Sequence, residues 1–246
     1  MFKKAAGLLV TLWLWFYIAI VTVVATFPIG FCSVFLAPFD PQRRLAHQFG
    51  TYWGQAVLLG NPFWKLKIIG RENIDHNKNY VIISNHTSLA DIIVLYSLNM
   101  QFKWMAKSSL FQIPFLGWSM SFMKYVALER GKHGSIRESY TKVKEWLNNG
   151  MSILIFPEGT RSPTGTLGEF KNGAFKLAVE SGIPILPIAL SGNQQAIGRG
   201  QAKFGAKVQA ILKVLPPIPV TKDMDPEKLK EKTRTLLAQE LNAITT

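Results

Sequence analysis

The chain has 246 residues, of which 48% are hydrophobic and 17% are charged. Average globular chains have about 25% charged residues, and disordered chains are polar and poor in aromatic residues, so this composition excludes an intrinsically disordered protein. The single cysteine, Cys32, excludes an intramolecular disulfide and any metal site built from several cysteines. We expect neither a bound metal nor a cofactor.

The net charge of +13 is unevenly distributed along the chain. Residues 1–39 contain only Lys3 and Lys4 as charged residues, so residues 40–246 carry 26 basic against 15 acidic residues, a net charge of +11. Such a basic body suits nucleic acid, an anionic membrane surface or small phosphorylated molecules. The sequence lacks an arginine-rich arm, a helix-turn-helix pattern and a zinc signature, and we expect no nucleic-acid partner.

An apolar segment without a charged residue extends from Ala5 to Phe39. Residues 5–27 alone would form a helix of about 34 Å, which is enough for a hydrocarbon core of about 30 Å. A secretory signal peptide is the rival interpretation, but its apolar region is only about 7–15 residues long and ends in a cleavage site that is missing here. The segment therefore predicts a membrane element.

Pro28, Gly30 and Pro38 interrupt the apolar segment, and basic residues flank both of its ends. The positive-inside rule then places both ends on the cytoplasmic side. We expect residues 1–40 to form a membrane-embedded helical hairpin in one leaflet, with a single tilted span as the alternative. Residues 41–246 would form a second domain on the cytoplasmic face of the membrane, which is the inner membrane if the source is bacterial.

Beyond this segment, strand patterns alternate with helix patterns. The expected strands are residues 66–69, 80–84, 102–106, 125–128, 152–156, 185–189 and 208–215. The expected helices are residues 42–59, 88–97, 114–123, 135–148, 173–181 and 226–243, the last of them with Asp225 as its N-cap. This alternation predicts an α/β fold with a mixed, largely parallel central sheet flanked by helices.

A histidine and an aspartate follow the second expected strand in the sequence Asn85-His86-Thr-Ser-Leu-Ala-Asp91. If His86 precedes a helix and Asp91 lies in its first turn, the carboxylate reaches one ring nitrogen and leaves the other as a base near neutral pH. The alternative is a helix cap at Asn85 or Ser88 with His86 as an ordinary loop residue.

The sequence Phe156-Pro-Glu-Gly-Thr-Arg-Ser follows the strand at 152–156. Gly159 allows close approach of the backbone to a ligand, and Arg161 offers a planar fork of donors for a phosphate or carboxylate. Lys107 and Arg130 also follow expected strands, where open α/β sheets place their sites. The alternatives are a surface turn with an ion pair between Glu158 and Arg161, and ordinary solvated cations.

These motifs together resemble the glycerolipid acyltransferase family, and within it the 1-acylglycerol-3-phosphate O-acyltransferases. The family pattern N-H-x4-D is matched at Asn85, His86 and Asp91, and F-P-E-G-T-R-S is matched in full at 156–162. The proline-containing strand at 183–188 and the segment that begins at Lys107 also match, while Arg130 fits the second motif only loosely and Phe-Lys-Asn-Gly at 170–173 departs slightly from the usual form. The resemblance covers roughly residues 60–220.

The resemblance implies transfer of a fatty acyl group from acyl-CoA or acyl carrier protein to the free hydroxyl of lysophosphatidic acid, at the surface of a lipid bilayer. His86 would act as the base and Asp91 would orient it. Glu158, Gly159, Thr160 and Arg161 would bind the phosphate end of the acceptor, with support from Lys107 and Arg130. Other lysolipids, such as a lyso-ornithine lipid, are alternative acceptors, and a non-catalytic lysolipid-binding protein is the alternative outside the enzymes.

Overall fold

A seven-stranded sheet forms the centre of the computed structural model, which describes residues 2–129, 131, 133–162, 164–197, 200, 202–205 and 207–245. Its strands are β1 (Trp64–Ile69), β2 (Val81–Ser84), β3 (Phe102–Lys107), β4 (Val126–Leu128), β5 (Ser152–Ile155), β6 (Ile185–Ser191) and β7 (Val208–Val214). Their order is β1-β7-β6-β2-β5-β3-β4, and every described pairing except that of β6 with β7 is parallel. The expected strands and the largely parallel sheet are confirmed.

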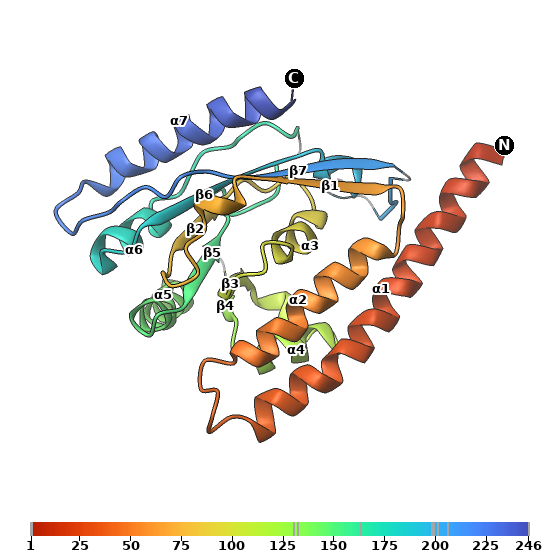
Figure 1. The fold of residues 1–246 in the computed structure, drawn as a ribbon, viewed down its shortest axis with the longest axis horizontal. Coiled ribbons are helices and arrows are strands. Elements are labelled where there is room, and N and C mark those ends of the chain that lie inside the picture. The colour runs from red at the N-terminus through yellow and green to blue at the C-terminus, as the bar shows by residue number, and fades with distance from the viewer. Residues whose placement is uncertain are drawn as a thin grey trace.

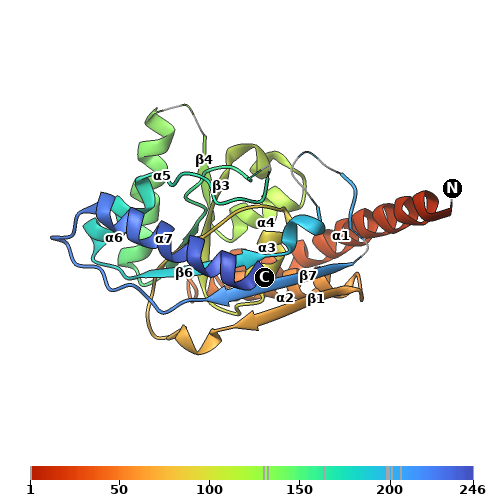
Figure 2. The ribbon, with the colours of Figure 1, turned by 90° about the horizontal axis from the view of Figure 1, so that it is seen from above.

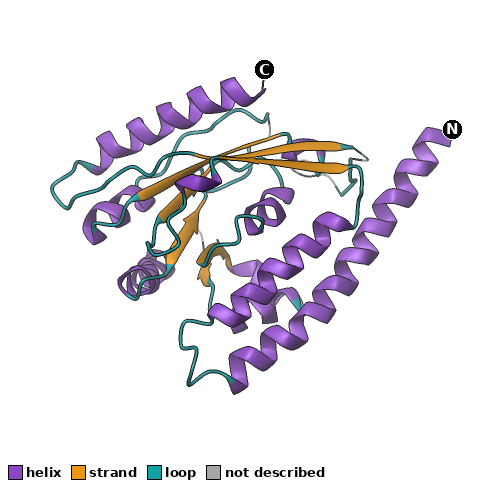
Figure 3. Ribbon diagram, viewed as in Figure 1, coloured by secondary structure: helices purple, strands orange, loops and turns teal. Residues whose placement is uncertain are grey.

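Helices cover both faces of this sheet (Figures 1 and 3). One face carries α1 (Phe2–Phe35), α2 (Arg44–Leu59), α3 (Ala90–Tyr96) and α4 (Leu116–Phe122), and the other carries α5 (His133–Asn148), α6 (Gly173–Ser181) and α7 (Pro226–Thr245). Short 3-10 turns occur at Arg71–Asn73, Ser108–Gln112 and Asn193–Gln195. The buried side chains accordingly form two main clusters. Tyr96 and Trp104 belong to the first, while Ile155 and Phe175 belong to the second.

The helical hairpin expected within residues 1–40 is wrong, and the single helix of the alternative is found, because α1 continues as one helix through Pro28 to Phe35. A proline inside a helix costs one backbone hydrogen bond, and here side chains on both sides of it hold the helix against the body. The Thr26 hydroxyl bonds Ser119 Oγ at 2.9 Å, and the Ser33 hydroxyl donates to the Phe122 carbonyl at 2.9 Å.

The chain reverses after α1 rather than within it, and α2 packs back along α1. Asp40 fixes the start of α2, because its carboxylate accepts the backbone N–H groups of Arg44 and Leu45, each at 2.9 Å. The expected amphipathic helix at 42–59 is therefore confirmed, but as the second arm of a two-helix unit. The N-terminal end of α1 extends beyond the rest of the described chain (Figure 2).

The sheet order brings the candidate site residues together. Strands β2, β5 and β3 are parallel neighbours, so their carboxyl ends lie along one edge of the sheet. His86 follows β2, Glu158 follows β5 and Lys107 ends β3. Residues separated by more than seventy positions in the sequence thus reach the same place.

Candidate active site

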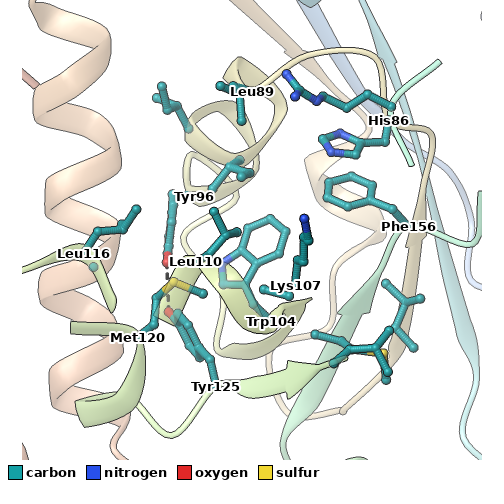
Figure 4. A pocket seen from close by; sticks show the side chains of 18 of the residues that line it. His86, Leu89, Tyr96, Trp104, Lys107, Leu110, Leu116, Met120, Tyr125 and Phe156 are labelled. Carbon is teal, nitrogen blue, oxygen red and sulfur yellow. Dashed lines mark hydrogen bonds between the residues drawn. The ribbon is translucent and has the colours of Figure 1, made fainter. Parts of the chain in front are cut away.

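His86 is held on two sides. Its Nδ1 atom lies 2.8 Å from Asp91 Oδ2, and its ring stacks on Phe156 with centroids 3.9 Å apart and 10° between the planes. A carboxylate can only accept, so Nδ1 is the donor of this hydrogen bond, and Nε2 is the acceptor atom of the neutral tautomer. The ring lines the cavity described below, with Phe156 beneath it (Figure 4). The helix-cap alternative also holds in part, because Ser88 Oγ accepts the N–H of Ala90.

Asp91 is fully buried and all of its oxygen atoms are engaged. In addition to His86, Oδ2 accepts the backbone N–H groups of Thr87 at 2.7 Å and Ser88 at 2.8 Å. Oδ1 accepts Asn193 Nδ2 at 2.7 Å. Donors around the carboxylate thus compensate its burial and aim it at one ring nitrogen.

Asn193 and Asn85 are structural contributors that the sequence did not reveal as such. Asn193 lies beyond β6, 102 positions after Asp91, and belongs to none of the recognised motifs. Asn85 exchanges two hydrogen bonds with the backbone of Leu190, of 2.9 and 2.8 Å, and so attaches the His86 loop to β6. Only the first residue of the N-H-x4-D pattern could have indicated this attachment.

Glu158 connects the two motifs instead of facing the cavity. Its Oε1 accepts the backbone N–H of His86 at 2.9 Å, and its Oε2 accepts the N–H of Gly168 at 3.1 Å. The side chain is buried, which raises the pKa of its carboxyl, while the two backbone donors oppose that rise. The backbone N–H of Ser162 also donates to the His86 carbonyl, at 2.8 Å, so the 156–162 loop and the His86 loop form one unit.

A cavity of about 760 Å³ opens beside His86. Among the sequence-predicted residues, its lining includes His86, Lys107, Gly159, Thr160 and Arg161. Arg130 lies outside the described residues. The expectation that these motifs converge therefore holds for every described member, with Asp91 and Glu158 placed behind the cavity wall.

The cavity has a polar end and a long apolar end. Lys107 and His86 lie at the polar end, and Tyr96, Met120 and Tyr125 lie at the apolar end, with Trp104 between them (Figure 4). Helix α1 contributes Trp15, Ile18, Thr22, Ala25 and Ile29 to the lining. The apolar wall thus includes the face of α1 that packs against the body.

Lys171 is a further lining residue, which the Phe-Lys-Asn-Gly segment had signalled without a role. Its Nζ lies 3.1 Å from the point that a Cβ at Gly159 would occupy, and Gly159 has a φ of +72°. A side chain at 159 would therefore be strained and would displace the lysine. Lys107 and Lys171 make no ion pair with a carboxylate that the structure describes, so both cations are available to an anion.

A histidine backed by a buried carboxylate, three cations and an apolar cavity together form a site that suits an anionic amphiphile. The acyltransferase family model matches residues 65–191, and the chain belongs to this family.

Named relatives agree with that assignment. A chloroplastic 1-acyl-sn-glycerol-3-phosphate acyltransferase of Arabidopsis thaliana is 38% identical over 190 residues, 75% of this chain and 53% of that protein. The corresponding protein of Pseudomonas aeruginosa is 31% identical over 74% of this chain and 72% of its own length. The crystal structure of the 1-acyl-sn-glycerophosphate acyltransferase of Thermotoga maritima superposes with a TM-score of 0.83 at 26% identity, covering 98% of both chains. The chain spans about half the length of the plant and algal relatives.

Proposed function

We propose that this protein transfers a fatty acyl group from a thioester to the hydroxyl of lysophosphatidic acid, which gives phosphatidic acid. The observation that carries the proposal is the hydrogen bond between His86 and Asp91 at the mouth of a cavity that is cationic at one end and apolar at the other. The names of the relatives supply the acceptor.

His86 Nε2 takes the proton of the acceptor hydroxyl while its oxygen attacks the thioester carbonyl carbon. Asp91 stabilises the resulting imidazolium through Nδ1. The carbon–sulfur bond then breaks, and the imidazolium returns its proton to the departing thiolate. The ester forms without an acyl-enzyme intermediate, and the charges balance at each step.

Lys107, Arg161 and Lys171 bind the phosphate of the acceptor, supported by the loop of Gly159 and Thr160. All five residues line the cavity close to His86 in the fold. We place Glu158 differently from the sequence-based expectation, as a positioning residue that holds the His86 backbone. The apolar end between α1, α3 and α4 receives an acyl chain, because its lining is aromatic and aliphatic.

Helix α1 supports a location of this site at a membrane. Gly7–Phe35 is long and apolar enough to cross a bilayer. Yet α1 contacts the body along its length, from Thr11, whose hydroxyl accepts the Phe204 N–H, to Ser33. We therefore propose that α1 lies in one leaflet with its outer face, which includes Leu9, Phe16 and Phe27, in lipid. The catalytic domain would stay at headgroup depth on the cytoplasmic side.

The test is an assay of the purified full chain in detergent micelles with lysophosphatidate and labelled palmitoyl-CoA, together with the His86→Ala variant. The proposal expects phosphatidate from the wild type and at least about a thousandfold less from the variant, because the base is lost. If other lysolipids are acylated but lysophosphatidate is not, one of those lysolipids is the acceptor instead. Equal turnover in the variant would refute the role of His86, and binding without turnover would favour a lysolipid-binding protein.

A further inference from the structure

The cavity beside His86 is not confined to one face of the sheet. Successive residues of β3 contribute to its lining, with Trp104 and Ala106 from one face and Met105 from the other. Met105 packs with the second core cluster, and Ile155 and Ala174 of the lining belong to that cluster. The cavity therefore passes around the carboxyl edge of the sheet.

Two arms of the cavity meet beside His86. The α1 arm, lined by Ile29, Tyr96 and Met120, lies on the face of the first cluster and receives the acyl chain of the donor in the proposed function. The α5 arm is lined by Met105, Ile136, Tyr140, Ile155 and Ala174 from the opposite face. With the donor's acyl chain in the α1 arm, the α5 arm remains unoccupied.

The surroundings of the α5 arm are those of an aqueous surface. Its lining residues Ile136 and Tyr140 belong to α5 and Ala174 belongs to α6. These helices lie on the face of the sheet opposite α1 (Figure 1). Exposed charged residues on these helices, such as Arg137 and Lys176, contrast with the exposed Phe16 and Phe27 of α1. A water-soluble ligand is thus expected to enter on this side, and a bilayer lipid on the side of α1.

Tyr140 gives the α5 arm a polar group that an alkyl chain could not use. Its hydroxyl lies against Gly173, where it occupies the place that a Cβ would take, and it makes no hydrogen bond with any described residue. Burial raises the pKa of this phenol, so it stays a neutral donor. A half-buried donor without a partner is matched by a ligand that carries amide oxygens.

A thioester has two substituents that leave its carbonyl carbon in different directions. When the carbonyl lies beside His86 and the acyl chain enters the α1 arm, the sulfur side must leave by another path. The α5 arm begins at the same place, and the helices α5 and α6 that line it carry exposed charged residues.

Resting on the proposed function, we propose that the α5 arm binds the pantetheine arm of the acyl donor. Coenzyme A and acyl carrier protein share this arm, including its two amide groups. Tyr140 hydrogen-bonds an amide, and Ile136 and Ala174 pack on the chain.

Cysteine tethering tests the location without relying on catalysis. Because Cys32 is the chain's single cysteine and is buried, a Cys32→Ser background carrying Ile136→Cys presents one thiol in the α5 arm. Pantethine, the disulfide of pantetheine, should form a mixed disulfide there. Palmitoyl-CoA or acyl carrier protein should slow this reaction at least about tenfold, which is the factor expected from near-saturation of the arm. Protection by only one of them identifies the donor.

Matched controls complete the test. Lys176→Cys, on the exposed side of α6, should react with pantethine but gain no protection. Lysophosphatidate and free palmitate should not protect Ile136→Cys. Protection by lysophosphatidate and not by the donors would assign the arm to the acceptor and overturn the proposal. Absence of protection by any of these compounds would also overturn it. Circular dichroism checks that both variants fold.

Kinetics of Tyr140→Phe in the unaltered chain provide a second measurement. Loss of one hydrogen bond should raise KM for palmitoyl-CoA about three- to tenfold and leave KM for lysophosphatidate unchanged. An unchanged donor KM would contradict the role of Tyr140. If the wild type makes no phosphatidate, the proposed function fails. The slowing of the pantethine reaction of Ile136→Cys by palmitoyl-CoA or acyl carrier protein would still show whether the α5 arm binds the donor.

Discussion

Replacing Asp91 by asparagine separates the charge of this residue from its geometry. An asparagine oxygen in place of Oδ2 can still accept from His86, Thr87 and Ser88. Its amide nitrogen would then face Asn193, whose Oδ1 atom is buried and has no partner at present. If the Asn193 amide flips, that oxygen accepts the new donor, and the number of buried polar atoms without a partner does not rise.

The loss of the negative charge at residue 91 then determines how far kcat falls. Two unit charges about 4 Å apart interact with about 4 kcal/mol at the effective dielectric constant of 20 that suits protein sites. Part of this stabilisation of the imidazolium is recovered from solvent, so Asp91→Asn should lower kcat by roughly 10²- to 10³-fold. The melting temperature should change little.

Asp91→Ala is the comparison, because it leaves the N–H groups of Thr87 and Ser88 buried without their acceptor. Each orphaned donor costs about 1–3 kcal/mol, so this variant should lose stability as well as activity. Steady-state assays in detergent and thermal unfolding measure the two effects. Activity of Asp91→Asn within tenfold of wild type would refute the electrostatic role, and equal stability of the two variants would refute the structural role.

Three further predictions concern other parts of the chain. Glu158→Gln can satisfy only one of the N–H groups of His86 and Gly168, so it should lose about 1–3 kcal/mol of stability and lower kcat; a change confined to KM for lysophosphatidate would instead place Glu158 on the substrate. Burial holds the pKa of His47 at about 3, so the unfolded chain, with a pKa near 6.5, binds the extra proton between these values. Stability should therefore fall by a few kcal/mol, at roughly 1.4 kcal/mol per pKa unit, as the pH drops from 6.5 towards 3, and a His47→Gln variant should show a flatter pH dependence in urea titrations. The double change Phe16→Glu and Phe27→Glu, on the outer face of α1, should abolish binding to anionic liposomes but spare turnover of a short-chain, micelle-free lysophosphatidate; unchanged liposome binding would exclude this face as the membrane contact.

Local sequence pattern was sufficient for the elements and for the motifs at their ends. Apolar runs such as 152–155 and the Asp225 cap of α7 depend on neighbours in the chain, and Asp225 Oδ1 indeed accepts the N–H of Glu227 at 2.9 Å. His86 and Asp91 were predicted as a pair for the same reason, because five positions separate them across one helix start.

Helix α1 shows where the pattern misled. Pro28 and Gly30 predicted a break, but contacts with Ser119 and Phe122 keep the helix continuous, and these partners are about ninety positions away. The reversal of the chain between α1 and α2 depends instead on Asp40, whose carboxylate accepts the N–H groups of Arg44 and Leu45.

Short-range patterns predict the strands and helices along the chain, the pairing of His86 with Asp91, and the cations that follow the strands. Contacts between distant segments account for the rest: Asn193 completes the environment of Asp91, Glu158 holds the His86 backbone, and the cavity continues around the sheet edge to the α5 side. The two groups differ in the sequence separation of the interactions that form them. Propensity and capping act within a few residues, whereas a buried polar partner or a cavity wall is made by segments that meet only when the sheet has assembled.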